Sequence, residues 1–219
     1  MRTWAFSLWL LALTAAPCLA TQVLELQPWQ LDCSRAEQRS IEQAISGAAA
    51  ILLPCGIRLQ ATPLQALQAD PQWCHLPDRP NERHTLLDAL ARPERLKNLH
   101  GLSLFILPSG PKARYAFSVI DTRAGAGCGS PQEESLLADS GSMFITDFGL
   151  GSNAAFSALL LAHEISHELT MKRHPTFAPR GSILADRAAD FGTRILESDC
   201  ICMRQSPFLR YCAHPPCLP

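Results

Sequence analysis

Residues 158–167 of this chain are ALLLAHEISH, an apolar run that leads into two histidines four positions apart. Ser152 or Asn153 can cap a helix before this run, and Pro175 marks its end. The spacing of the residues around the run is helical. The residues that recur at this spacing are Phe156, Leu159, Leu160, His163 and His167.

Two histidines at this spacing can hold one zinc ion. On a helix, the rings of His163 and His167 leave the same face, about 6 Å apart along the axis. Glu164 can reach the water that completes the coordination shell and take its proton during attack on a carbonyl group. A chance HExxH is rare, because only 7 of the 219 residues are histidine. The pattern predicts zinc-dependent (Zn2+) hydrolysis of peptide bonds, with Glu164 as the general base.

A zinc site of this kind needs a third protein ligand, and His174 is one candidate. HExxH followed by a later histidine resembles the metzincins, in which a glycine after the second histidine bends the chain back toward the metal. Here Thr170 stands at that glycine position, and no glycine lies between His167 and His174. On a helix continuing to Pro175, His174 would lie about 10 Å further along the same face. A metzincin-type protease is therefore an alternative that requires a sharp turn at Thr170.

Asp186 is the other candidate for the third ligand. It begins the segment Asp186-Arg-Ala-Ala-Asp190, within a helix predicted to run from Ser182 to about Glu197, where both aspartates share one face. Asp186 can complete the zinc site, and Asp190 can accept a hydrogen bond from the outer nitrogen of a ligating histidine. The alternative is a solvated acidic stripe together with Thr193 and Glu197.

Residues 141–174, GSMFITDFGLGSNAAFSALLLAHEISHELTMKRH, resemble the HtpX-like gluzincins of the prenyl-protein-endopeptidase type. In that family a strand and a turn lead into the active-site helix, and the third zinc ligand is the glutamate of an ExxAD motif. Residues 186–190, DRAAD, match this motif with aspartate in place of glutamate, and DFGT at 190–193 is similar to a segment of thermolysin-type gluzincins. The resemblance covers roughly residues 115–197. It implies that His163, His167 and Asp186 hold the metal.

The chain as a whole predicts an α+β fold. We expect a small antiparallel sheet packed on the active-site helix and on a second, ligand-bearing helix, stapled by disulfides. Ser34 to Glu37 is a capping-box signature for a helix that runs towards Leu53. Residues 56–80 contain four prolines and are expected to be irregular and stapled by Cys55 and Cys74. Three runs bounded by glycine and proline clusters predict strands: Leu102 to Leu107, Tyr115 to Asp121, and Ser142 to Phe148.

Two parts of the mechanism are less well defined by the sequence. In similar gluzincins the strand before the active-site helix is the open edge of the sheet, so Ser142 to Phe148 is expected to pair with an extended peptide. A residue must also stabilise the developing oxyanion. The candidates for this role are Arg194, Tyr211 and His214.

Residues 1–20 have the pattern of an export signal. Arg2 precedes an apolar stretch from Trp4 to Ala16, which is shorter than the ~20 residues of a membrane span, and small residues precede a cleavage point near Ala20. We expect a periplasmic or extracellular protein without a stable membrane span; a retained anchor is the alternative. Residues 21–219 are expected to form one domain, divided into an N-terminal helical region (21–100), a catalytic core (101–197) and a cysteine-rich tail (198–219).

Charge and cysteine content limit the partners and the compartment. Without residues 1–20 the net charge is near −2 and no block of basic residues occurs, which argues against nucleic acid and leaves protein or peptide substrates. The eight cysteines that follow residue 20 allow up to four disulfides in an oxidising compartment. No CxxC pair is present, so the spacing of a zinc ribbon is absent.

A non-catalytic function is the alternative from a different class. Aspartate in place of glutamate at position 186, and the undefined oxyanion residue, also fit an envelope protein that binds partners and is stabilised by zinc or by disulfides alone. Metal content together with hydrolysis of an unfolded protein separates this alternative from the two peptidase hypotheses.

Overall fold

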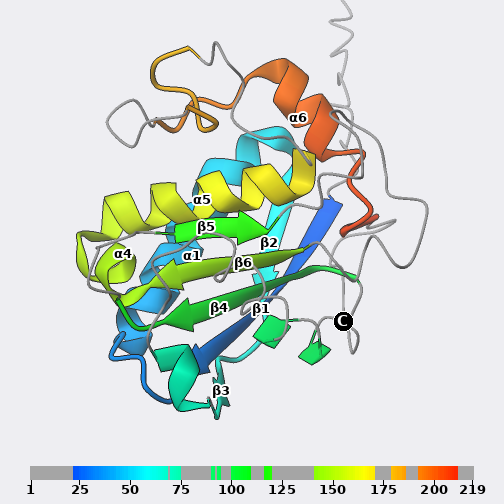
Figure 1. Cartoon of the computed structure of the whole chain (residues 1–219). Coiled ribbons are helices and arrows are strands. Elements are labelled where there is room, and N and C mark those ends of the chain that lie inside the picture. The colour runs from blue at the N-terminus through cyan, green and yellow to red at the C-terminus, as the bar shows by residue number, and fades with distance from the viewer. Residues whose placement is uncertain are drawn as a thin grey trace, which may run out of the picture.

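The computed structural model confirms the α+β class: one mixed sheet is covered by helices (Figure 1). The residues described below are 22–68, 70–74, 90–91, 93–94, 100–109, 116–119, 141–170, 179–185 and 192–211. The helices of the described part are α1 (Gln38–Leu52), α4 (Asp147–Gly151), α5 (Ala154–Thr170) and α6 (Glu197–Met203), with 3-10 turns η1 (Leu53–Cys55) and η2 (Pro71–Cys74).

The sheet is mostly parallel, so the prediction of an antiparallel sheet is wrong. The strands are β1 (Gln22–Leu31), β2 (Ile57–Ala61), β3 (Gln65–Leu67), β4 (Leu102–Leu107), β5 (Ala116–Val119), β6 (Ser142–Thr146) and β7 (Leu209–Tyr211). Their order is β2-β1-β4-β6-β5, with β3 and β7 also pairing with β1. The pairs of β1 with β2, β3 and β4, and of β4 with β6, are parallel, whereas β5 and β7 pair antiparallel with β6 and β1.

The central strands are buried on both faces, as is usual in a parallel sheet. Every residue of β4 and β6 is buried, and strands buried on both faces are nearly continuous apolar runs rather than alternating ones. Leu104, Ile106 and Ile145 pack in the larger core cluster, and Phe105 and Phe144 belong to the cluster on the other face. The two phenylalanine rings stack at a centroid distance of 5.3 Å.

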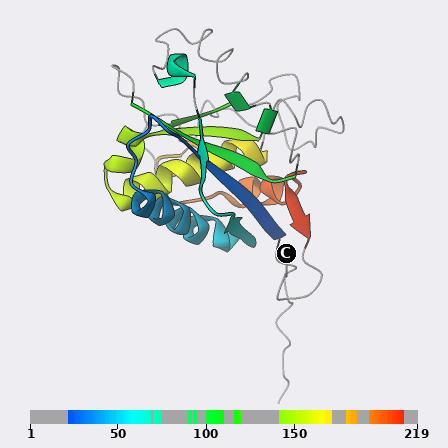
Figure 2. The same ribbon diagram turned by 90° about the horizontal axis from the view of Figure 1, so that it is seen from below.

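Helices α1 and α5 lie together on one face of the sheet (Figure 2). The buried residues of α1 are spaced by three or four, as expected for a helix with one apolar face: Ile41, Ala44, Ala48 and Leu52. The two helices approach closely where Gly47 of α1 faces Ala158 of α5. A Cβ atom at Gly47 would lie 2.3 Å from the Cβ of Ala158, so this crossing requires a glycine.

The N-terminal region differs from the sequence expectation. The strand β1 was not predicted, because Pro28 and several glutamines interrupt its apolar residues. Two further strands, β2 and β3, lie in the segment 56–80 that was expected to be irregular. The helix α1 begins at Gln38 with Glu37 as its N-cap and no side-chain cap bond. Ser34 does not form the predicted capping box.

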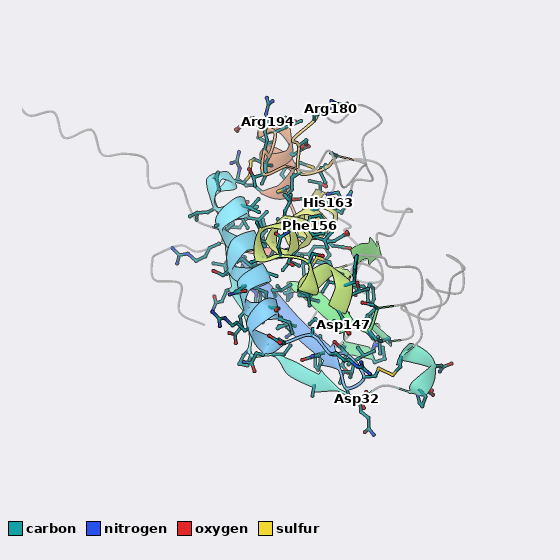
Figure 3. The ribbon with its side chains drawn as sticks, turned by 90° about the vertical axis from the view of Figure 1, so that its left-hand side faces the viewer. Asp32, Asp147, Phe156, His163, Arg180 and Arg194 are labelled. Carbon is teal, nitrogen blue, oxygen red and sulfur yellow. A yellow bond between two sulfur atoms is a disulfide. The ribbon has the colours of Figure 1, made fainter. Side chains whose placement is uncertain are left out.

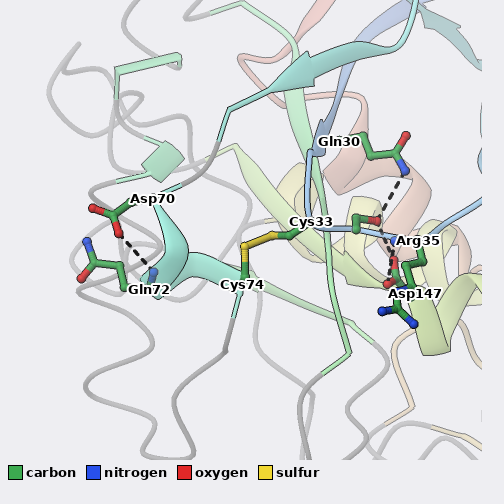
Figure 4. The surroundings of a disulfide bond; sticks show 8 residues. Gln30, Cys33, Arg35, Asp70, Gln72, Cys74 and Asp147 are labelled. Atoms are coloured by element: carbon green, nitrogen blue, oxygen red, sulfur yellow. Dashed lines mark hydrogen bonds between the residues drawn. A yellow bond between two sulfur atoms is a disulfide. The ribbon is translucent and has the colours of Figure 1, made fainter.

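Ser34 instead joins the start of α1 to the end of β6. Its hydroxyl donates to the Asp147 carboxylate at 2.6 Å, and the amide of Arg35 donates to the other carboxylate oxygen at 3.0 Å (Figure 4). Asp147 is the first residue of α4, so the last part of the predicted strand 142–148 is helical. These two hydrogen bonds fix the chain shortly before α5.

Disulfides staple the domain as predicted, but Cys55 and Cys74 do not pair with each other. Cys33 bonds to Cys74 (Figure 4), and Cys55 at the end of η1 bonds to Cys200 in α6. Cys202 is also disulfide-bonded. No helix of the described residues is both long and apolar enough to cross a membrane.

Candidate metal centre

Helix α5 carries the HExxH motif through the middle of the domain. Asn153 caps it, since its side-chain oxygen accepts from the amide of Phe156 at 2.8 Å, which confirms the predicted start. Its residues from Leu160 to Thr170 are all buried between the sheet, α1 and α6. Ser157 donates to the Gly149 carbonyl at 2.8 Å and thereby ties α5 to α4. The helix is therefore held along its whole length.

The two histidines of the motif meet on one face of α5. The Nε2 atoms of His163 and His167 are 3.0 Å apart, and the rings are perpendicular with centroids 4.4 Å apart. Two nitrogen ligands of a tetrahedral zinc ion, each at about 2.1 Å, are separated by about 3.4 Å. Both side chains are buried, with 2% and 4% of their surface exposed. The two nitrogens therefore converge at nearly the separation that a shared ion requires.

The hydrogen bond made by Nδ1 of His163 determines which of its two ring nitrogens can bind a metal. His163 Nδ1 is hydrogen-bonded to the backbone carbonyl of Ile183. Because a carbonyl oxygen only accepts, Nδ1 carries the proton and Nε2 presents a lone pair toward His167. A neutral imidazole oriented in this way by a second group is typical of zinc-binding histidines. Sequence reasoning gave this role to an aspartate and missed Ile183, because a backbone acceptor leaves no side-chain signal.

The carbonyl of Ile183 belongs to a backbone pairing that we call the glycine clasp, formed by residues 181–183 and 192–194. The amide of Ile183 donates to the Arg194 carbonyl at 2.9 Å, and the amide of Arg194 donates to the Gly181 carbonyl at 3.1 Å. Ser182 and Arg194 form a parallel β-bridge. Residues 182–185 and 192–196 are not helical, so the helix predicted from Ser182 to Glu197 is wrong at both ends.

Two acidic side chains of α5 are buried with the histidines. Glu164 is 6% exposed. Glu168 is completely buried, and one of its carboxylate oxygens accepts from the amide of Gly141 at 2.8 Å. Gly141 precedes β6 and has a positive φ of 78°. Glu168, which no sequence motif singled out, therefore joins α5 to the start of β6.

The other candidate residues are only partly described. Asp186, Asp190, His174 and His214 lie outside the described residues. Helix α5 remains helical to Thr170, whose hydroxyl donates to the Ser166 carbonyl at 2.6 Å. Arg194 lies on the glycine clasp at the same end of the molecule as His163 (Figure 3). Tyr211 lies on β7 beside β1 and is 76% exposed.

A second group of potential ligand atoms lies at the opposite end of the molecule from His163. It consists of Asp32 with Cys33 and Cys74 (Figure 3 labels Asp32). The two sulfurs form a disulfide, so they are not thiolates that bind metal. Among the described residues, His163 and His167 therefore remain the candidate pair for a metal ion.

Comparison with known proteins gives a structural likeness without a sequence match. Neither a protein-family model nor a curated protein matches the sequence. The structure is similar to metalloproteinase-II from Bacteroides fragilis, with a TM-score of 0.54, 14% identity and coverage of 87% of this chain. It is also similar to a chaperone–substrate complex, with a TM-score of 0.51, 8% identity and coverage of 84% of this chain and 33% of that one.

A further similar structure is the zinc-dependent peptidase from Methanocorpusculum labreanum, with a TM-score of 0.47, 14% identity and coverage of 82% of this chain and 99% of that one. The present chain spans about half (55%) of the length of the Bacteroides fragilis protein. The first likeness shows the fold alone: the chain shares its fold with the part of metalloproteinase-II that it covers.

Proposed function

We propose that this protein is an exported zinc-dependent endopeptidase that cleaves unfolded or flexible protein segments. The observation that carries the proposal is the 3.0 Å approach of His163 Nε2 and His167 Nε2 on a buried helix, with His163 Nδ1 occupied by a carbonyl. Without a metal, two Nε2 atoms at this distance can share only one hydrogen bond, for which one ring must carry its proton on Nε2. A shared zinc ion accounts for the approach of both nitrogens.

The donor set fits zinc better than the hard cations. Neutral imidazole nitrogens suit zinc and other transition metals, whereas calcium and magnesium prefer oxygen ligands. When bound, zinc makes a water molecule nucleophilic near neutral pH. In this chain His163 and His167 would hold the ion. Glu164 would accept the proton of the attacking water, because it follows the first ligand on the same helix.

Asp186 is proposed as the third ligand. Its neighbour Ala185 is buried (2% exposed), and Ile183, three positions before Asp186, touches the ring of His163. Three residues span at most about 11 Å, so the chain between Ile183 and Asp186 limits how far Asp186 can lie from His163. His174 competes for the role only if the chain turns sharply after Thr170. Asp190 is proposed to bond the outer nitrogen of His167, because the carbonyl of Ile183 already serves His163.

Substrate binding is proposed at β5, and the sequence-based choice of the strand 142–148 is wrong. That strand, β6, lies between β4 and β5 and has no open side among the described residues. The strand β5 ends the sheet order on this side and lies next to α5 (Figure 1). An extended peptide can pair with such an edge through its backbone, which favours unfolded segments as substrates. Export is supported by the disulfides, which form in oxidising compartments.

The test is hydrolysis of an unfolded protein by the mature chain and by its Glu164→Gln variant. We expect the variant to keep its zinc and to lose activity by about 100-fold or more, which is the usual contribution of a general base. Equal activity of the two proteins would remove Glu164 from the mechanism. Zinc binding without hydrolysis in the wild-type chain would instead establish the non-catalytic envelope protein.

A further inference from the structure

We infer that the glycine clasp is a positioning device for the metal site and that Gly192 is the residue that keeps it closed. The inference rests on the proposed zinc site, and it concerns how this chain prepares His163 to bind the ion. It assigns a role to Gly181, Gly192 and the backbone of Ile183, none of which belongs to the HExxH motif.

The first step is the contact of the clasp with the metal-binding ring. The carbonyl of Ile183 accepts a hydrogen bond from His163 Nδ1–H, which leaves Nε2 as the unprotonated nitrogen. The bond made by one ring nitrogen determines which nitrogen is free for a metal. Without an acceptor at this place, the proton can move to Nε2 and must then be removed before a metal binds. The clasp therefore acts on the metal site through the tautomer of His163.

The second step is the way in which the clasp fixes this carbonyl. Both backbone polar groups of Ile183 are hydrogen-bonded: its amide donates to the Arg194 carbonyl at 2.9 Å, and its carbonyl accepts from His163. Its side chain is completely buried in the larger core cluster. The amide of Gly192 also donates to the Ser182 carbonyl at 3.4 Å. Residue 183 can therefore move away from His163 only if the pairing with residues 192–194 changes.

The third step is the requirement for glycine at position 192. A Cβ atom there would lie 2.3 Å from the carbonyl oxygen of Gly181 and 2.5 Å from its Cα atom. Both atoms are backbone, so the two sides of the clasp would have to separate by roughly 1 Å to reach van der Waals contact. A displacement of that size breaks hydrogen bonds at the present 2.9 and 3.1 Å. Gly192→Ala therefore opens the clasp with the addition of a single methyl group.

Gly101→Ala is the matched control. Its Cβ atom would also collide with a backbone carbonyl, at 2.6 Å from the oxygen of Glu25, and its φ of +95° adds strain. This collision lies between β1 and the start of β4, and it touches neither the clasp nor α5. The control therefore destabilises the fold without altering the contact between Ile183 and His163.

The experiment uses the full mature chain with 15N-labelled histidine, first free of metal and then titrated with zinc. At a pH of about 8, where an ordinary histidine is neutral, NMR identifies which ring nitrogen of His163 is protonated. A His163→Gln variant assigns the signal. Wild type and Gly101→Ala are expected to show the Nδ1–H form, and Gly192→Ala a mixture or the Nε2–H form. The zinc dissociation constant of Gly192→Ala should rise about 10–100-fold, as for other groups that orient a metal ligand.

A Gly192→Ala protein that keeps the Nδ1–H form and the wild-type zinc affinity would overturn the inference and leave the proposed zinc site intact. A wild-type chain that binds no zinc would overturn the proposed function, while the tautomer comparison still decides the role of the clasp. If Gly192→Ala does not fold, Arg194→Pro replaces it. That variant removes the amide that donates to Gly181 and places the Cδ atom of the proline ring where the amide hydrogen was, so it also opens the clasp. It is expected to show the same change of tautomer.

Discussion

At the scale of single residues, the site depends on a few groups that each perform one task. His163 and His167 provide nitrogens 3.0 Å apart, the carbonyl of Ile183 accepts from His163 Nδ1, and Glu164 is the proposed base. The HExxH spacing made the convergence of His163 and His167 predictable, because a helix brings positions four apart to one face. The backbone acceptor was not predictable, since its position depends on a pairing between residues distant in sequence.

The proposed third ligand predicts which of two substitutions weakens zinc binding more. Asp186→Ala should weaken zinc binding far more than His174→Ala, because α5 is still helical at Thr170, where the metzincin alternative needs a turn. Asp186→Glu should be tolerated, since the resembling family uses glutamate. Zinc titration of the three variants measures the ranking. A greater loss of affinity in His174→Ala than in Asp186→Ala would favour the metzincin-type site.

At the scale of elements, the crossing of α1 and α5 is predicted to control stability. Gly47→Ala adds a methyl group 2.3 Å from the Cβ of Ala158, and overpacking of this kind typically costs about 1–3 kcal/mol of unfolding free energy. Ala158→Gly removes the colliding atom, so the double variant should recover part of the loss. Gly151→Ala is the control, because a Cβ atom there meets nothing within 4 Å. Chemical denaturation of the two single variants, the double variant and the control measures the free energy of unfolding of each. If the effects of Gly47→Ala and Ala158→Gly simply add in the double variant, the two positions do not collide.

The position of β6 changes the expected effect of a proline in this strand. Because β6 pairs on both sides, Ile145→Pro removes a hydrogen bond from the interior of the sheet and should cost about 3 kcal/mol or more. We expect a poorly folded protein, seen as a lower midpoint of thermal unfolding. A stably folded Ile145→Pro variant that has lost only peptide cleavage would instead support substrate binding at β6.

The elements also show where sequence reasoning succeeds. Strong local signals gave β4, β6 and α5, including Asn153 as the cap of α5, with small errors at the ends. The direction of the strands was not predictable from these signals, because the partner β1 contains Pro28 and joins β4 from about 75 residues away in the chain. The non-helical residues 182–185 were mistaken for a helix start, since Ser182 resembles a cap. Its oxygen does accept from the amide of Leu184 at 3.3 Å, as that of a cap would, but residues 182–185 are not helical.

At the scale of the whole molecule, disulfides join distant parts of the domain. Cys55–Cys200 spans 145 residues and Cys33–Cys74 spans 41. If disulfides act mainly on the unfolded chain, removal of the longer one should cost about 1 kcal/mol more. Denaturation of Cys55→Ala/Cys200→Ala and of Cys33→Ala/Cys74→Ala compares the two costs. An equal or smaller loss for the longer disulfide would contradict the entropic account.

The central claim is that the histidine pair of α5 holds zinc, and metal content tests it most directly. Elemental analysis of the mature chain, purified without chelator, should give one zinc ion per molecule. His167→Ala should lose the metal, because it removes one of two nitrogens that meet at 3.0 Å, whereas Glu164→Gln should retain it. A folded wild-type protein without stoichiometric zinc, or a His167→Ala protein that keeps it, would contradict the account.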